Sequence, residues 1–311
     1  MPTGTVDISW GTLQQIVRGW AGSSADLAEF MPLVGGSLST TLCLTLKDGR
    51  KAALKITPHR VDRRYADEAL QLHVLKEAGM PVPEVYAFHV GTLDSPFSYV
   101  LMEFVEGVDL HAAKSTCSSD EYDCVQTHLA ELLCKLHSNT GPYFMRVTGT
   151  DARRHHDWPR FYRDLFDPIW HEVEKDGGLP PKYRKVVAKV HDRLDRLIAH
   201  DDVPRLVHWD VWATNLLTRC GDGGKWQVCA LLDPNCKFAH AEAEIAYLEL
   251  FHTVTPAFMK AYQHWHKLPP EYHRVRKPVY QLYSLLNHLR LFGHEYLKPA
   301  VAQIEKLAPL V

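Results

Sequence analysis

The chain has 311 residues, 46% of them hydrophobic and 23% charged, which is enough for one large or two medium domains with a sizeable core. Its formal net charge is −2 and no cluster of lysine and arginine is suited to a phosphate backbone, so a nucleic-acid partner is not expected. There is no run of 18 apolar residues and no secretory signal at the N-terminus, so we expect a cytoplasmic protein without a membrane partner.

The seven cysteines have irregular spacings and include no Cys-x-x-Cys pair. This pattern argues against a zinc or redox site and favours reduced, mostly buried thiols. The sequence does not indicate the oligomeric state.

The first hundred residues predict a β-rich lobe. Residues 7–30 have apolar positions at roughly helical spacing and predict one or two helices. Asp48-Gly49 lies between two alternating runs, which is a strong signal for a β-hairpin. The elements expected after the first helices are strands at Thr40–Leu46, Lys51–Ile56, Val85–Val90 and Ser98–Phe104, and a helix at Arg63–Ala78.

The rest of the chain is predicted to be mainly helical. The expected helices are Asp120–His137, Trp158–Lys175, Tyr183–His200 and the region from Ala241 onwards, with a loop and a short hairpin at residues 206–233. A connector near residues 103–107 would join the two parts. This order indicates an α+β, bilobal protein-kinase-like fold, with a nucleotide-binding lobe at residues 1–104 and a catalytic and substrate-binding lobe at residues 105–311. Up to this point the assignment is an analogy of fold, so the function must be argued from the site.

The segment from Leu206 to Leu217 has the spacing Asp-x-x-x-x-Asn of a kinase catalytic loop. Phosphoryl transfer needs a carboxylate that orients the acceptor hydroxyl and takes its proton, and a second group that holds magnesium. Asp210 is the predicted base and Asn215 the predicted metal ligand. The preceding His208 and the apolar flanks make this pattern more specific than its spacing alone.

A second carboxylate follows an apolar strand. Asp233 comes 18 residues after Asn215, where protein kinases place the aspartate of Asp-Phe-Gly. Together with Asn215 it would supply the oxygen ligands that Mg²⁺ prefers. Taken alone, Asp233 before Pro234 is more simply a turn or helix-capping residue.

Residues near the N-terminus predict the nucleotide contacts. A loop that contains Gly35, Gly36, Ser37 and Ser39 offers backbone N–H groups and hydroxyls to phosphates, although a Gly-Gly pair is more often an ordinary turn. Lys55 in Ala-Ala-Leu-Lys-Ile resembles the Val-Ala-Ile-Lys strand of kinases, and Glu68 in the next helix is its expected partner. The order of these groups along the chain strengthens each separate match.

The connector Val100–Gly107 is the predicted adenine site. In this fold the carbonyl of Glu103 and the N–H of Val105 would face the base, with Met102 behind it. The simpler alternative is an edge strand followed by a turn.

These motifs together resemble the fructosamine-3-kinase (ketosamine kinase) family within the aminoglycoside phosphotransferase-like superfamily. The resemblance covers most of the chain. The family pattern His-Gly-Asp-Leu-Trp-x-x-Asn appears as residues 208–215, and Asp-Pro-Ala before an acidic helix appears as Asp233-Pro-Asn before 241–251. Further matches are Asp157-Trp…Phe166, Tyr280-Gln-Leu…Asn-His288 and Phe292-Gly-His-Glu-Tyr296.

The resemblance implies an enzyme that uses ATP and Mg²⁺ to phosphorylate a small sugar amine. It implies that Trp212 forms a wall for the sugar, with His288 and Glu295 as further substrate candidates whose alternative role is helix packing or surface pairing. Trp209 stands where the family has Gly. Protein kinases accept Arg at that position, so the backbone is not expected to require Gly.

The sequence leaves open both the acceptor and an alternative function without catalysis. The acceptor can be an aminoglycoside, another amine or a small alcohol, and a cationic acceptor would need an acidic pocket. The acidic segment Glu242–Glu249 is more simply a helix start and surface. A nucleotide-binding pseudokinase or regulatory module is the alternative of another class, against which the retained Lys55, Asp210 and Asp233 argue.

Overall fold

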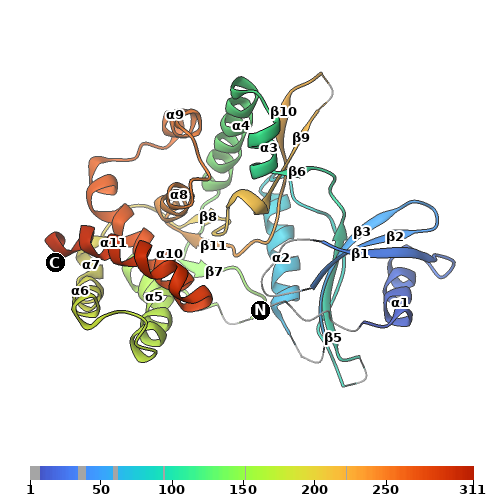
Figure 1. Ribbon diagram of the computed structural model, residues 1–311, viewed down its shortest axis with the longest axis horizontal. Coiled ribbons are helices and arrows are strands. Elements are labelled where there is room, and N and C mark those ends of the chain that lie inside the picture. Colours follow the sequence, from blue (N-terminus) through green and yellow to red (C-terminus); the bar gives the residue numbers. More distant parts are fainter. Residues whose placement is uncertain (1–7, 34–39, 59–61, 94, 151, 222) are drawn as a thin grey trace. The chain divides into compact units, whose positions relative to one another are not determined.

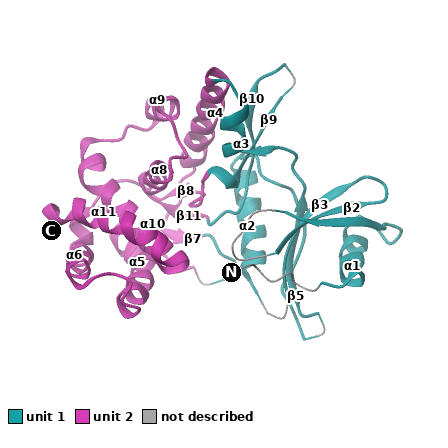
Figure 2. Ribbon diagram, in the orientation of Figure 1, with its two compact units in different colours: residues 1–118, 147–151, 213–235 teal, residues 119–146, 152–212, 236–311 magenta. Residues whose placement is uncertain are grey.

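The computed structural model describes residues 8–33, 40–58, 62–93, 95–150, 152–221 and 223–311 (Figure 1). The chain forms two compact units, each assembled from separate stretches of sequence (Figure 2). Unit 1 comprises residues 1–118, 147–151 and 213–235, and unit 2 comprises residues 119–146, 152–212 and 236–311. The predicted lobes, 1–104 and 105–311, are continuous, whereas the compact units are not, and that lobe boundary stays a prediction.

Unit 1 contains a five-stranded antiparallel sheet with the strand order β1-β2-β3-β5-β4. Its strands and helices are β1 (Leu27–Pro32), β2 (Thr40–Leu46), β3 (Lys51–Pro58), β4 (Val85–His89), β5 (Phe97–Glu103), α1 (Trp10–Ala21) and α2 (Arg64–Glu77). The predicted β2–β3 hairpin is confirmed, with Gly49 at a φ of +87° in its turn. A left-handed residue at this place is the reason why the turn favours glycine.

The prediction of helix as far as residue 30 is wrong. Helix α1 ends at Ala21, and Gly22, with a φ of +100°, follows as its cap. The chain then pairs with β2, Leu27 opposite Leu46 and Phe30 opposite Leu44. Only the first of the six residues of β1 is buried, so the segment lacks the alternation of apolar and polar residues that would predict a strand.

Different helices pack against the two faces of the sheet, because side chains alternate along each strand. One core cluster joins Leu13 of α1 to Leu54 of β3, and a second joins Leu72 of α2 to Val100 of β5. Lys55 follows Leu54 along β3 and pairs with Val100. It therefore faces α2, the helix that carries its predicted partner.

The remaining part of unit 1 is a second, smaller sheet with the order β10-β9-β6. Its elements are β6 (Val108–Asp109), α3 (Leu110–Thr116), a 3-10 turn at Ala213–Asn215, β9 (Leu216–Cys220) and β10 (Trp226–Leu231). The hairpin predicted within residues 206–233 is thus confirmed. Gly107 lies where a Cβ atom would come within 2.9 Å of the Thr218 carbonyl oxygen, so the connector needs a glycine to pass this close to β9.

Unit 2 is mainly helical, as predicted, around the short sheet β7-β11-β8. Its elements are α4 (Ser119–His137), β7 (Met145–Arg146), α5 (Trp158–Lys175), α6 (Pro181–Asp192), α7 (Leu194–Leu197), β8 (Arg205–Val207), β11 (Lys237–Ala239), α8 (Ala241–Leu250), α9 (Pro256–Trp265), a π-helical turn at Tyr272–Arg276, α10 (Lys277–Phe292), a 3-10 turn at Gly293–Tyr296, α11 (Leu297–Leu307) and a last 3-10 turn at Ala308–Leu310. The helix predicted at Tyr183–His200 is interrupted at Arg193, which has a φ of −104° and a ψ of 8°. The break lets Leu194 become fully buried.

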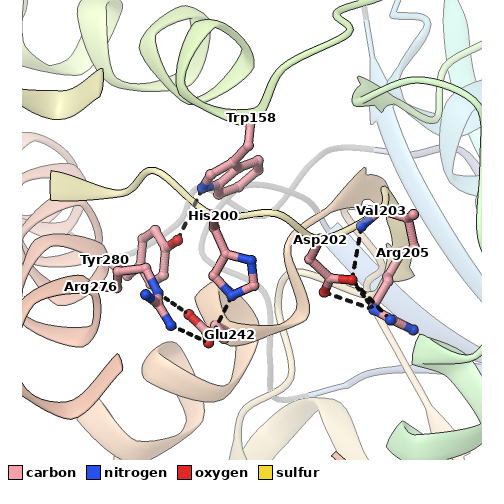
Figure 3. Close-up of polar contacts among 8 residues, drawn as sticks. All are labelled: Trp158, His200, Asp202, Val203, Arg205, Glu242, Arg276 and Tyr280. Carbon is pink, nitrogen blue, oxygen red and sulfur yellow. Dashed lines mark hydrogen bonds and ion pairs between the residues drawn. The ribbon is translucent and has the colours of Figure 1, made fainter. Parts of the chain in front are cut away.

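Polar contacts inside unit 2 hold α8 in place (Figure 3). Glu242 accepts two hydrogen bonds from the Arg276 guanidinium, at 2.5 and 2.8 Å, and lies 3.1 Å from His200 Nε2. The Trp158 indole N–H donates to the Tyr280 hydroxyl at 3.0 Å. The Glu242 and Arg276 side chains are each 9% exposed, and separating such a buried pair costs about 3–5 kcal/mol when one partner is removed. This fixed helix carries residues of the site described below.

The seven cysteines all lie in the described part of the chain, and none of them forms a disulfide. The expected burial is correct for Cys43, Cys134 and Cys236 and wrong for Cys124 and Cys220, which are exposed. Among the described residues, none of the helices combines the length and the apolar character needed to cross a membrane.

Candidate active site

Lys55 is the centre of a buried charged cluster in unit 1. Its Nζ atom donates to Glu68 Oε1 at 2.5 Å and also contacts Asp233 Oδ1. Lys55 itself is only 9% exposed. Burial lowers the pKa of its ammonium group, but the two carboxylates outweigh this effect and raise it to about 12. Burial also raises the pKa of Glu68, against the attraction of Lys55. The Lys55 ammonium group therefore stays protonated inside β3, between two carboxyl groups.

The β9–β10 hairpin brings Asn215 and Asp233 together although they are 18 residues apart. Leu216 pairs with Leu231 at the end of the hairpin, and the Leu232 N–H donates to the Asn215 carbonyl oxygen at 2.9 Å. Asp233 follows directly. Its φ of +54° lies in the left-handed region, which Asp and Asn enter more readily than most residues. Two oxygen-bearing side chains thus come from adjacent backbone positions.

The connector residues lie at the end of β5 and in the segment after it, and their predicted contact with adenine stays a prediction. Met102 is 4% exposed and belongs to the core cluster between α2 and β5. Glu103 ends β5, and its N–H donates to the Glu84 carbonyl oxygen at 2.8 Å. Val105 lies in the irregular segment between β5 and β6 and is half-buried. The predicted change from strand to connector at residues 103–107 is therefore present.

Gly35, Gly36, Ser37 and Ser39 lie outside the described residues. Their assignment to nucleotide phosphates stays a prediction.

The predicted base, Asp210, lies in unit 2 just after β8. Its carboxylate oxygen Oδ1 accepts a hydrogen bond from the Tyr247 hydroxyl at 2.7 Å. Its backbone N–H donates to Nδ1 of the fully buried His208 at 3.3 Å. Burial and the neighbouring Asp210 raise the pKa of Tyr247, so the phenol stays protonated and is the donor in this contact.

Trp209, the residue before the base, has a φ of +70°. The position thus accepts a residue other than glycine, as expected, although the left-handed region costs a residue with a Cβ about 1–2 kcal/mol. Contacts with the neighbouring residues offset this cost. The Trp209 N–H donates to Glu244 Oε1 at 2.5 Å, and Lys237 Nζ lies 4.7 Å from the centre of the indole ring.

The carboxylates of Glu242 and Glu244 on α8 are buried, whereas the segment 242–249 was expected to be a helix start on the surface. Glu244 is 1% exposed and also lies 2.7 Å from His137 Nε2. Glu242 is 7% exposed and is paired with Arg276. The helix start is confirmed, but these two carboxylates serve internal contacts and do not form an acidic pocket for a cation.

The three predicted substrate residues also lie in unit 2. Trp212 is 38% exposed. His288 is half-buried, with Nδ1 2.8 Å from the Ser284 carbonyl oxygen and its ring 4.7 Å from that of Phe251. Glu295 is exposed in the 3-10 turn after α10. The positions of these three residues leave their predicted contacts with the substrate untested.

Sequence reasoning missed two residues, Glu244 and Tyr247. They lie three positions apart on α8 and contact Trp209 and Asp210, which are consecutive in the chain. Apart from its three glutamates the sequence of α8 is apolar around the whole helix, and such a composition is typical of a buried helix. That pattern was the available signal, because a glutamate in such a helix needs an internal partner.

The described residues contain no group of three or more His, Cys, Asp or Glu side chains suited to hold a metal ion.

The sequence profile of the fructosamine kinase family matches residues 9–309. A probable ketoamine kinase of Vibrio parahaemolyticus is 27% identical over 288 residues, 90% of this chain and 93% of that protein. A crystal structure from Thermobifida fusca that carries the name fructosamine-3-kinase superposes with a TM-score of 0.77 at 22% identity, and covers 97% of this chain and 100% of its own. The aminoglycoside phosphotransferase APH(4)-Ia, solved with ADP and hygromycin B, has a TM-score of 0.68 at 18% identity over 96% and 98% of the two chains. These two likenesses confirm the predicted α+β, protein-kinase-like fold.

Proposed function

Because the chain belongs to the fructosamine kinase family, we propose that it is an ATP-dependent phosphotransferase whose acceptor is a hydroxyl of a ketosamine, a ketose joined to an amine. The observation that carries the proposal is the β9–β10 hairpin. It places Asp233 next to Asn215 in the backbone, while Asp233 also contacts the buried Lys55. Binding of a metal ion and of phosphates needs oxygen ligands and a cation held close together, and this arrangement supplies them.

The donor set of the hairpin fits Mg²⁺. Asn215 offers an amide oxygen and Asp233 offers carboxylate oxygens, and magnesium in kinases keeps several waters and takes further ligands from the phosphates. When bound, the ion neutralises charge on the phosphate oxygens. Lys55 adds a fixed positive charge for the nucleotide phosphates, and Glu68 keeps its side chain in one position. Gly35, Gly36, Ser37 and Ser39 are proposed to donate to the phosphates, and Met102, Glu103 and Val105 to enclose the adenine.

Asp210 is the proposed base. The acceptor oxygen attacks the γ-phosphorus and forms a P–O bond, the bond to the oxygen between the β- and γ-phosphorus breaks, and ADP leaves with that oxygen. The proton of the acceptor hydroxyl passes to the Asp210 carboxylate. Most of the rate enhancement then comes from position and charge, because the protein forms no covalent bond.

The exposed indole of Trp212 is the proposed wall against the sugar, because an aromatic face packs well on C–H groups. His288 and Glu295 are further acceptor candidates. An aminoglycoside or another amine is the second candidate acceptor, and it is less well supported because the buried Glu242 and Glu244 do not offer negative charge to a cation.

The test is incubation of the protein with MgATP and a fructosyl-lysine derivative, followed by product mass and ADP release. We expect a gain of one phosphoryl group, which Asp210→Ala abolishes while ATP binding persists. Asp201→Ala, which removes an exposed carboxylate nearby in the sequence, is the matched control and should retain activity. Transfer to aminoglycosides alone would contradict the proposed acceptor. ATP binding without transfer to any acceptor would indicate a regulatory module instead.

A further inference from the structure

The hydrogen bond from Tyr247 to Asp210 places a second residue at the proposed base. Glu244 and Tyr247 are three positions apart on α8 and so lie on the same side of the helix. Glu244 accepts from the backbone N–H of Trp209, and Tyr247 donates to the side chain of the next residue, Asp210. One helix therefore contacts both the backbone and the side chain of the catalytic loop.

The position of the Tyr247 hydroxyl is determined by packing and not only by its hydrogen bond. Its ring lies 4.8 Å from the ring of Phe251, at an interplanar angle of 57°, and 6.4 Å from that of His288. The residue is half-buried on a helix that the Glu242–Arg276 pair holds within unit 2. A donor held in this way limits rotation of the carboxylate that it contacts.

We propose that Tyr247 is a positioning residue for phosphoryl transfer, which fixes the Asp210 carboxylate in the orientation that receives the proton of the acceptor hydroxyl. This inference rests on the proposed function, because it acts through Asp210. The phenol is neutral, so it orients the carboxylate without cancelling its negative charge. A donor to the ionised form of a carboxylate also favours that form, and therefore extends the pH range in which Asp210 can accept a proton.

The variant that tests the proposal is Tyr247→Phe, which removes one oxygen atom and keeps the ring against Phe251. We expect kcat to fall about tenfold, in line with the loss of one charge-assisted hydrogen bond. The KM for ATP should not change, since Tyr247 acts on the base. The acid limb of the kcat profile should move to higher pH, because a carboxylate without its donor binds a proton more tightly.

The same helix offers a matched control. The Tyr272 hydroxyl donates to Glu249 Oε2 at 2.5 Å, so Tyr272→Phe also removes a tyrosine–carboxylate hydrogen bond on α8 but leaves Asp210 untouched. We expect Tyr272→Phe to retain the wild-type kcat and pH profile. If both variants lose activity in parallel, or if Tyr247→Phe has the wild-type kcat and acid limb, the positioning role is overturned.

A second replacement covers the case in which Tyr247→Phe does not fold. Difluorotyrosine at position 247 keeps the shape and makes the hydroxyl a stronger donor, so the acid limb should move to lower pH. An unchanged acid limb would overturn the proposal. The Asp210→Ala variant distinguishes a failure of the proposed function from a failure of this inference. If Asp210→Ala keeps the wild-type rate, Asp210 is not the base. If Asp210→Ala is inactive and Tyr247→Phe is fully active, only the role of Tyr247 is refuted.

Discussion

Each of the two units buries a lysine, and the pKa values of the two lysines are shifted in opposite directions. Lys55 in unit 1 is 9% exposed and contacts Glu68 and Asp233, which raise the pKa of its ammonium group to about 12. Lys237 in unit 2 is 1% exposed and lies over the indole ring of Trp209. Burial, with a smaller contribution from Arg146, lowers the pKa of Lys237 well below its ordinary value, and the attraction of Asp210 and Glu244 does not reverse this.

The comparison indicates that Glu68 and Asp233 outweigh the cost of burying the charge of Lys55, whereas the attraction of Asp210 and Glu244 does not outweigh the burial of Lys237. The charge of Lys55 is kept in the unit to which we assign the phosphate contacts. In unit 2 the neutral Tyr247 phenol donates to Asp210, and Lys237, whose charged form is disfavoured by burial, lies over the indole ring of Trp209.

The largest expected effect is a difference in the free energy of unfolding when each of the two lysines is replaced by methionine. Lys55→Met leaves the Glu68 and Asp233 carboxylates without their cation, and removal of one partner from a buried ionic cluster costs about 3–5 kcal/mol. Lys237→Met replaces a buried amine by an apolar chain of similar shape and should cost less than about 1.5 kcal/mol. Denaturant unfolding at pH 7 measures both free energies. Equal losses would contradict the proposed difference between the two sites.

The pH dependence of Lys237 sharpens the same comparison. Its folded pKa is lowered from 10.5, so between the lowered value and 10.5 the unfolded chain binds more protons and stability rises with pH. The slope for one group is at most about 1.4 kcal/mol per pH unit. We expect Lys237→Met to lose this increase while Lys51→Met, a change in an exposed ion pair with Glu106, keeps it. Unfolding series from pH 7 to pH 10 test the difference.

His240 in unit 2 is expected to make the stability of the protein depend on pH in the acid range. Burial lowers the pKa of His240 from 6.5 to about 3, with a further contribution from His200. Between these values the unfolded chain binds the extra proton, so stability falls as pH drops below 6.5 and stops falling near pH 3 for this group. His240→Leu should reduce the loss of thermal stability between pH 7 and pH 5. An unchanged pH slope in that variant would show that other groups cause the loss.

The smallest expected effect concerns the backbone beside the base. Trp209→Ala and Trp209→Gly both remove the indole from Lys237, but only glycine accepts the φ of +70° without strain. Although glycine ordinarily costs stability, here Trp209→Gly should be more stable than Trp209→Ala by about 1 kcal/mol. Thermal unfolding of the two variants gives the comparison, and a more stable alanine variant would contradict the strained geometry.

Local patterns were sufficient to predict where Lys55 and Asp233 lie in unit 1, although their roles stay a proposal. The alternation along Lys51–Ile56 places Lys55 on the α2 face, and the apolar run before Asp233 predicts the strand that leads to it. The glycine loop stays a prediction from sequence. Strand β1 was missed because its pairing with β2 depends on contacts between distant residues.

The support of Asp210 could not be predicted in the same way. Glu244 and Tyr247 follow their partners by 35 and 37 residues, and the acidic helix was expected to be a surface. Which side of α8 faces Trp209 and Asp210 is decided by packing inside unit 2, including the Glu242–Arg276 pair. The positive φ of Trp209 could not be predicted either, because a tryptophan in the sequence does not indicate a left-handed backbone conformation.

The most direct test of the central claim is phosphorus NMR of the protein with MgATP and fructosyl-lysine. The account predicts that ADP appears together with an equal amount of a new phosphomonoester of the sugar, and that Asp210→Ala forms neither. ADP with free inorganic phosphate and no sugar ester, or an Asp210→Ala variant that forms the ester at the wild-type rate, would contradict the account.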